Sequence, residues 1–127
     1  MVILDTNIII DHLHLQKKGH DSELMKIARL KPKEVLALSM ISVQELYEGQ
    51  STKDENMEQY LLATISPLRI LPYTYEIAQL AGEIARDLNR SIELADATIA
   101  ATAILNGGVL LTLNKKDFSG IKDLIMY

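Results

Sequence analysis

Cysteine is absent from this sequence, and so are long apolar runs and a basic N-terminal segment. Without cysteine the chain forms neither disulfides nor thiolate metal sites, which is compatible with residence in the cytoplasm. No stretch approaches the ~20 consecutive apolar residues that a membrane-spanning helix needs. The N-terminus also lacks the basic region and small-residue cleavage site of a secretory signal. We therefore expect a cytoplasmic protein with no membrane partner.

The chain has no excess of positive charge either. It contains 17 Asp and Glu residues and 13 Lys and Arg residues, which gives a net charge of -4. Proteins that bind nucleic acids are normally basic, so this balance at first argues against such a partner. The argument weakens if four of the acids hold a cation, since the other 13 acids then balance the 13 basic residues. A bound metal would also invert the local field. Net charge therefore does not decide the substrate.

What the sequence does contain is an alternation of short apolar runs with helical patterns. Its 127 residues, 48% hydrophobic and 24% charged, predict one domain over residues 1–127 with a core of its own. We expect strands at residues 2–4, 35–38, 68–71 and 109–113 and a weak one at 124–126. Helical spacing between them predicts helices that begin near Thr6, Ser22, Ser42, Thr74 and Glu93, and another through Ile65. This order predicts an α/β fold with a parallel sheet of about five strands, covered on both faces.

The first eleven residues, MVILDTNIIID, carry the first candidate site residue. An apolar run ends abruptly at Asp5, and apolar residues then resume at roughly helical spacing. Asp5 thus lies where a strand gives way to a helix. Ligands of α/β proteins bind outside the carboxyl ends of the strands, which makes this junction a candidate site.

Three more acids occupy positions that topology assigns to the same sheet edge. Glu45 is expected in the first turn after the second strand, Asp96 in the first turn of the helix before the fourth strand, and Asp117 just after that strand. Each has an ordinary alternative as a helix cap, a first-turn acid or part of a capping box that starts at Ser42. The joint case is stronger, because Asp5 and Asp96 lie within very apolar segments where water cannot easily solvate a carboxylate. Clustered acids of this kind must take up protons or bind a cation.

Oxygen ligands without cysteine favour Mg²⁺ or Mn²⁺ over zinc. Such ions activate water and neutralise charge on a phosphoryl group during displacement. Neutral hydrogen-bond donors next to the acids can orient the carboxylates from outside the ligand set. The candidates for this supporting role are Thr6, Asn7, Thr112 and Asn114, whose alternative is that of ordinary turn and cap residues.

Four segments resemble blocks of the PIN domain family, in the family's order, and within it the VapC-type toxins of toxin-antitoxin systems. The segments are LDTNIIID, SVQELYEG, LADATIAATA and LLTLNKKDF. The resemblance covers essentially the whole chain and implies an α/β/α sandwich and a metal-dependent ribonuclease. It matches the family's acidic residues to Asp5, Glu45, Asp96 and Asp117. It also implies an antitoxin as a protein partner and a homodimer.

Other functions remain open from the residues alone. A housekeeping PIN ribonuclease would carry the same acids without an antitoxin. Phosphoryl transfer through Asp5 as a nucleophile would usually require a second acid two residues on, where this chain has Asn7. A catalytically silent module that binds RNA or protein is the third alternative, and the complete acidic set argues against it.

Two further patterns bear on partners. Lys115 and Lys116, and likewise Arg86 and Arg90, can contact an RNA backbone through its phosphates, or can simply be solvated. A run of apolar residues around α-helical positions 61–68 exceeds what one small core is expected to bury. It therefore predicts a dimer interface or a groove for a partner; its members are Leu61, Leu62, Ile65 and Leu68.

Overall fold

A parallel sheet lies at the centre of the computed structural model, which describes residues 1–127. Its strands are β1 (Val2–Leu4), β2 (Leu36–Ser39), β3 (Arg69–Leu71) and β4 (Val109–Leu111), in the order β3-β2-β1-β4. All three strand pairs are parallel. The carboxyl ends of β1, β2 and β4 therefore lie at the same edge of the sheet, as the alternation of strands and helices predicts.

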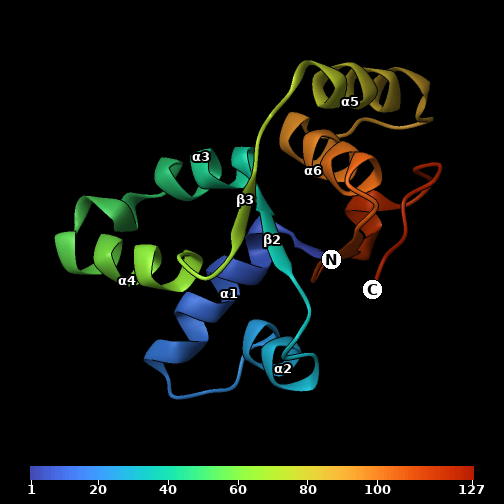
Figure 1. Ribbon diagram of the computed structural model, residues 1–127. Coiled ribbons are helices and arrows are strands. Elements are labelled where there is room, and N and C mark those ends of the chain that lie inside the picture. Colours follow the sequence, from blue (N-terminus) through green and yellow to red (C-terminus); the bar gives the residue numbers. More distant parts are fainter.

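Six helices cover the two faces of this sheet (Figure 1). They are α1 (Thr6–Lys17), α2 (Glu23–Leu30), α3 (Met40–Glu48), α4 (Glu55–Ile65), α5 (Tyr75–Asp87) and α6 (Leu94–Leu105), with short 3-10 turns η1 (Gln50–Lys53) and η2 (Lys115–Phe118). The predicted α/β/α fold class is confirmed. None of these helices has both the length and the apolar character needed to cross a membrane.

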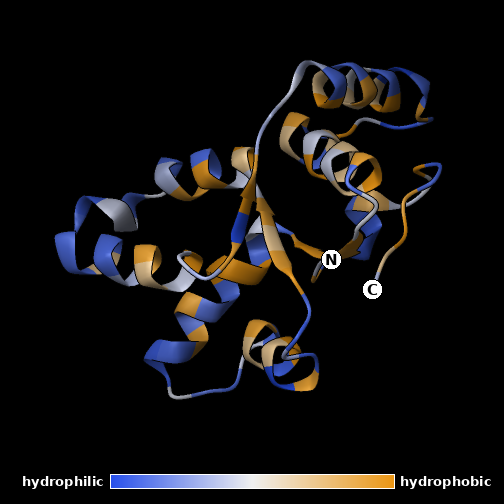
Figure 2. Ribbon diagram, viewed as in Figure 1, coloured by the Kyte–Doolittle hydropathy of each residue, from blue (hydrophilic) through white to orange (hydrophobic).

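Alternate residues of each strand supply two separate cores. Val2 and Leu4 pack with side chains of α1, α2 and α4, whereas Ile3 packs on the opposite face with Ile99 of α6. Helix α5 lies outside α6 and packs on it through a smaller cluster. Figure 2 shows the consequence, with apolar residues on the central strands and mixed polar and apolar residues on the outer helices.

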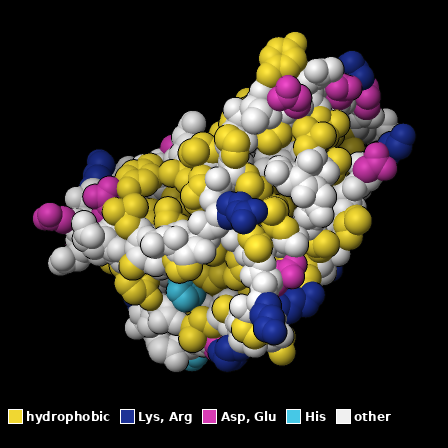
Figure 3. Space-filling view, in the orientation of Figure 1, with side chains coloured by type: hydrophobic (Ala, Val, Ile, Leu, Met, Phe, Trp, Pro, Cys, Tyr) yellow, Lys and Arg dark blue, Asp and Glu magenta, His cyan; other side chains and the backbone are white.

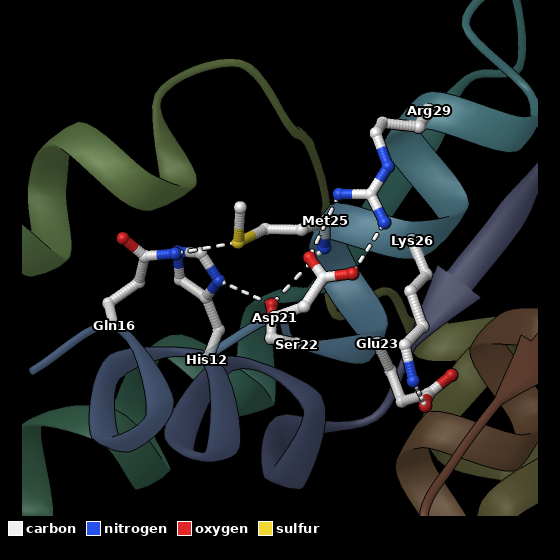
Figure 4. Close-up of polar contacts among 8 residues, drawn as sticks. All are labelled: His12, Gln16, Asp21, Ser22, Glu23, Met25, Lys26 and Arg29. Atoms are coloured by element: carbon white, nitrogen blue, oxygen red, sulfur yellow. Dashed lines mark hydrogen bonds and ion pairs between the residues drawn. The ribbon is translucent and has the colours of Figure 1, made fainter. Parts of the chain in front are cut away.

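The corner between α1 and α2 is closed by polar contacts, which Figure 4 shows. Ser22 caps α2 by accepting a hydrogen bond from the backbone N–H of Met25 at 3.2 Å, as predicted for this helix start. The Ser22 hydroxyl also lies 2.7 Å from Nδ1 of His12. Arg29 makes a two-pronged ion pair with Asp21 across the same turn. These contacts fix how α2 returns against α1.

The ends of β2, β3 and β4 differ from the predicted strand ends by one or two residues, and two further differences change the interpretation. Helix α3 begins at Met40 and not near Ser42, because Ser39 both ends β2 and caps the helix by accepting from the backbone N–H of Ile41. The capping box expected at Ser42 is therefore wrong. The terminal strand at 124–126 is reduced to a single bridge between Leu110 and Met126, so the sheet proper has four strands.

The turn from α6 to β4 contains two adjacent glycines, Gly107 and Gly108. Gly107 has a φ of +63°, a left-handed conformation that glycine adopts without steric cost. Gly108 approaches β1 so closely that a Cβ there would lie 2.9 Å from Cγ1 of the buried Ile3. The turn thus brings β4 into register beside β1 and delivers the residues after β4 to the sheet edge.

Candidate active site

Asp5 follows the last residue of β1 and is only 6% exposed. It occupies the N-cap position of α1, yet its side chain makes no capping hydrogen bond. One carboxylate oxygen, Oδ2, instead accepts a 2.7 Å hydrogen bond from the hydroxyl of Thr112, just beyond β4. Burial raises the pKa of Asp5, and the charges of Glu45 and Asp117 add to the rise. The hydroxyl of Thr112 and the backbone N–H of Thr6 lower this pKa and so oppose the rise. The Asp5 carboxylate therefore does not act as an ordinary helix cap.

Glu45 reaches the same region from the second turn of α3, one turn further along than predicted. Its Oε1 accepts a 2.6 Å hydrogen bond from the hydroxyl of Thr6, which in turn lies 2.8 Å from the hydroxyl of the buried Ser42. The single Thr6 proton goes to the carboxylate, because an ionised carboxylate only accepts. Ser42 then donates to Thr6, and the pair of hydroxyls orients Glu45.

Asp96 lies in the first turn of α6, as predicted. Its pKa is raised to about 6, first by burial and then by the charges of Asp5, Asp117, Glu45 and Glu93. A carboxyl group with such a value holds its proton in weakly acidic solution unless positive charge is supplied. Asp96 is thus a group whose pKa all three other candidate acids raise.

Asp117 lies in η2, on the turn that follows β4. Its Oδ2 accepts a 2.9 Å hydrogen bond from the side-chain amide of Asn114. Asn7, on α1, accepts a 3.4 Å hydrogen bond from the backbone N–H of Leu113 and so ties the start of this turn to α1. The predicted supporting residues Thr6, Asn7, Thr112 and Asn114 all make contacts here.

The chain can now be compared with known proteins. The sequence model of the family described as the PIN domain matches residues 2–124. The chain belongs to the PIN domain family. This agrees with the arrangement of its sheet, its helices and the acids at the sheet edge, and it confirms the predicted resemblance.

Curated relatives of this PIN domain are full-length matches. Ribonuclease VapC19 of Mycobacterium tuberculosis is 30% identical over 129 residues, which cover 98% of this chain and 97% of that protein. Ribonuclease VapC1 of Haemophilus influenzae is 32% identical, over 96% of this chain and 92% of that protein. The comparison with solved structures finds VapBC2 from Rickettsia felis bound to a DNA fragment from its promoter. One chain of that structure matches with a TM-score of 0.86 and 29% identity, over 100% of this chain and 98% of that one.

The carboxylates of this PIN domain lack a positively charged partner. None of the four is among the acids in ion pairs, which are Asp21, Glu23, Glu34 and Asp87. The hydrogen bonds from Thr6, Thr112 and Asn114 come from neutral groups and so orient the carboxylates without neutralising them. The four carboxylates offer a metal only oxygen atoms as ligands, which suits a hard divalent ion such as Mg²⁺ or Mn²⁺.

The side chains are near one another without forming a finished metal cage. No group of three or more Asp, Glu or His side chains is arranged to hold a metal ion between them. Two ionised carboxylates at ~4 Å repel by about 4 kcal/mol at an effective dielectric of 20, so a closer cluster requires protons or a cation. Their role as metal ligands stays a prediction.

Two residues of the site were missed by the sequence analysis. The sequence pattern predicts Ser42 as a helix cap, whereas Ser42 is buried and its hydroxyl lies against that of Thr6. Glu93 raises the pKa of Asp96 and, with Glu45, Glu48 and Asp96, lines a groove of about 470 Å³. Glu93 directly precedes the first turn of α6 that carries Asp96, and this proximity was the signal available in the sequence.

The raised pKa of Asp96 predicts how the stability of the metal-free protein depends on pH. The folded state binds this proton more tightly than the unfolded state, because the pKa moves from 3.8 to about 6 on folding. The free energy of unfolding contributed by Asp96 is therefore fully present below pH ~4 and is lost as pH rises through about 6. Urea unfolding of wild type and Asp96→Asn between these pH values, in chelator, isolates this contribution. The wild type should lose stability relative to the variant as pH rises, and parallel curves would contradict the assignment.

Proposed function

We propose that this PIN domain is an endoribonuclease that depends on Mg²⁺ or Mn²⁺ and acts as the toxin of a toxin-antitoxin pair. The observation that carries the proposal is the raised pKa of the buried Asp5 and of Asp96, caused by burial and neighbouring carboxylates with no cation among the causes. Such an arrangement is costly for an ordinary structural site and is stabilised by a bound cation. The names of the VapC relatives, which are called ribonucleases, support the choice of reaction.

In this proposal Asp5, Glu45, Asp96 and Asp117 hold one or two ions. When bound, such an ion lowers the pKa of water and neutralises charge on a phosphoryl group. The chain's own contribution is orientation. Thr112 orients Asp5, the hydroxyls of Thr6 and Ser42 orient Glu45, and Asn114 orients Asp117.

The proposed protein partner is an antitoxin segment that covers part of the site. A mainly apolar cavity of about 310 Å³ lies between α1, α3 and α4, and Leu13, Leu46 and Leu61 are among its lining residues. Glu45 also lines this cavity, so it continues toward the carboxylates. An apolar helix face bound there, with one basic side chain reaching the acids, would combine both features. Solved relatives described as VapBC support this partner. One of them is VapBC-1 from nontypeable Haemophilus influenzae, with a TM-score of 0.80 and 29% identity over 100% of this chain and 97% of that one.

A homodimer, a single domain over residues 1–127 and a cytoplasmic location complete the proposal. The apolar surplus expected at positions 61–68 is smaller than predicted, because Leu61 is buried and Ile65 and Leu68 pack against the core. Leu62 remains 39% exposed. Figure 3 shows hydrophobic side chains gathered over the region of α3, α4 and β3, and such a surface supports a partner or a second copy.

Expression of this chain alone in bacteria tests the proposal in cells. We expect growth to slow and new RNA ends to accumulate, because an unrestrained ribonuclease degrades cellular RNA. Asp5→Asn should abolish both effects at equal protein level. When the small protein encoded beside the gene is expressed together with the chain, it should copurify and suppress both effects. Normal growth with unchanged RNA ends would contradict the toxin assignment, and growth inhibition that persists in Asp5→Asn would contradict the site.

A further inference from the structure

Arg90, in the loop between α5 and α6, is bound to the turn that carries Asp117. Its Nη2 donates hydrogen bonds to the backbone carbonyls of Asp117 at 3.0 Å and of Ser119 at 2.7 Å. Its Nη1 donates to the carbonyl of Ser91 at 3.3 Å. The guanidinium therefore links the start of the α5 to α6 connection with a turn that lies 27 to 29 residues further along the chain.

This use of Arg90 differs from that of Arg86, although both are exposed arginines near the end of α5. Arg86 pairs with the carboxylate of Asp87 through two hydrogen bonds and makes no hydrogen bond to another helix, strand or turn. Arg90 is in no ion pair, and its hydrogen bonds all go to backbone carbonyl oxygens. Arginine is suited to this role, because its planar fork presents several donors at once in a fixed geometry.

The turn that Arg90 contacts is short and presents its last carbonyls to a donor outside the turn. η2 is four residues long, and the backbone bonds around it, from Asp117 to Asn114 and from Ser119 to Lys116, are 3.2 and 3.3 Å. The last carbonyls of a helix have no partner within it, and a basic side chain can satisfy them. Phe118, 1% exposed, anchors the turn on the core side, and Arg90 holds it on the solvent side.

We propose that Arg90 is a positioning residue for Asp117: it holds the backbone of the turn while Asn114 holds the carboxylate, so that Asp117 stays beside Asp5 and Asp96. This inference rests on the proposed function, since it makes Arg90 necessary for a metal site that includes Asp117. It replaces the phosphate contact that the sequence suggested for Arg90. Three of its five N–H groups already have carbonyl partners.

The test compares Arg90→Gln and Arg90→Lys with Arg86→Gln, which removes the same charge nearby. In metal-free protein, NMR should show faster hydrogen exchange at the Asp117 and Ser119 amides in Arg90→Gln and unchanged exchange in Arg86→Gln. By calorimetry, the dissociation constant for Mn²⁺ should rise about tenfold in Arg90→Gln, the lower end of the range for residues that orient metal ligands. Arg90→Lys should restore little, because a lysine has no planar fork to span these carbonyls.

A third measurement separates positioning from phosphate binding. The affinity for a single-stranded RNA in chelator is measured against salt, where each phosphate contact contributes about 0.7 to the slope. An unchanged slope in Arg90→Gln supports positioning, whereas a slope reduced by about 0.7 with unchanged Mn²⁺ affinity overturns it. Unchanged exchange at Asp117 and Ser119 overturns it as well. Absence of Mn²⁺ binding by the wild type would overturn the proposed function instead, and the exchange data would still decide whether Arg90 holds the turn.

Discussion

Replacing Asp96 with Asn is expected to lower RNA cleavage by at least about a hundredfold, the scale on which loss of one charge-stabilising group acts. Asp96 is close enough to the other three carboxylates that Asp5, Asp117 and Glu45 all raise its pKa. An amide keeps the shape but cannot supply a negative charge to a cation. The measurement is the initial rate of cleavage of a structured RNA in Mn²⁺, and Asp5→Asn should behave in the same way.

The fold should survive both substitutions, because each removes a carboxylate whose ionisation burial and like charges disfavour. Asp123→Asn is a suitable control. Asp123 is an exposed acid whose charge is not among those that shift Asp5 or Asp96, and its φ of +68° is one that asparagine also tolerates. Wild-type cleavage in Asp96→Asn and Asp5→Asn, in protein free of contaminating nuclease, would refute the site.

Mn²⁺ is expected to raise the melting temperature of the wild-type protein strongly. A ligand that binds only the folded state at 100 times its dissociation constant stabilises it by about 2.7 kcal/mol. For a chain of this size that corresponds to a rise of about 8–15 °C. Glu45→Gln should reduce the rise, because it removes one of the proposed ligands and leaves the Thr6 hydroxyl an amide oxygen to bind.

Glu48→Gln provides the matched control for Glu45→Gln. Glu48 follows Glu45 by one turn of α3 and accepts a hydrogen bond from the side-chain amide of Gln44. Its charge is not among those that raise the pKa of Asp5 or Asp96. Its variant should keep the full response to Mn²⁺. A wild-type melting temperature that does not move at millimolar Mn²⁺ would count against a carboxylate metal site, and an equal loss in both variants would indicate nonspecific charge effects.

The sheet edge with its acids could be predicted from the sequence because strand ends are visible there. The run Val2–Leu4 stops at an acid, and β4 is followed by a polar turn, so parallel topology assigns Asp5 and Asp117 to the same edge. Asp96 was placed correctly in a first turn because Glu93 and the small apolar residues of α6 define the helix start.

Contacts between distant residues could not be predicted in the same way. Ser39 ends a strand and caps a helix at once, so the sequence pattern predicts a helix start that is too late and assigns the cap to Ser42. The pairing of Arg90 with the carbonyls of Asp117 and Ser119 leaves no periodic pattern, because backbone oxygens are present at every residue. The tertiary structure alone reveals these two supports.

The most direct test of the central claim is the restoration of cleavage by metal in one preparation. Purified wild-type protein is incubated with structured RNA in chelator, and excess Mn²⁺ or Mg²⁺ is then added while the cleavage rate is followed. We predict no cleavage in chelator, prompt cleavage after addition of the ion, and no restoration in Asp96→Asn. Cleavage that continues in chelator, restoration in Asp96→Asn, or a trapped phosphoenzyme at Asp5 would contradict a metal-dependent ribonuclease built on these four carboxylates.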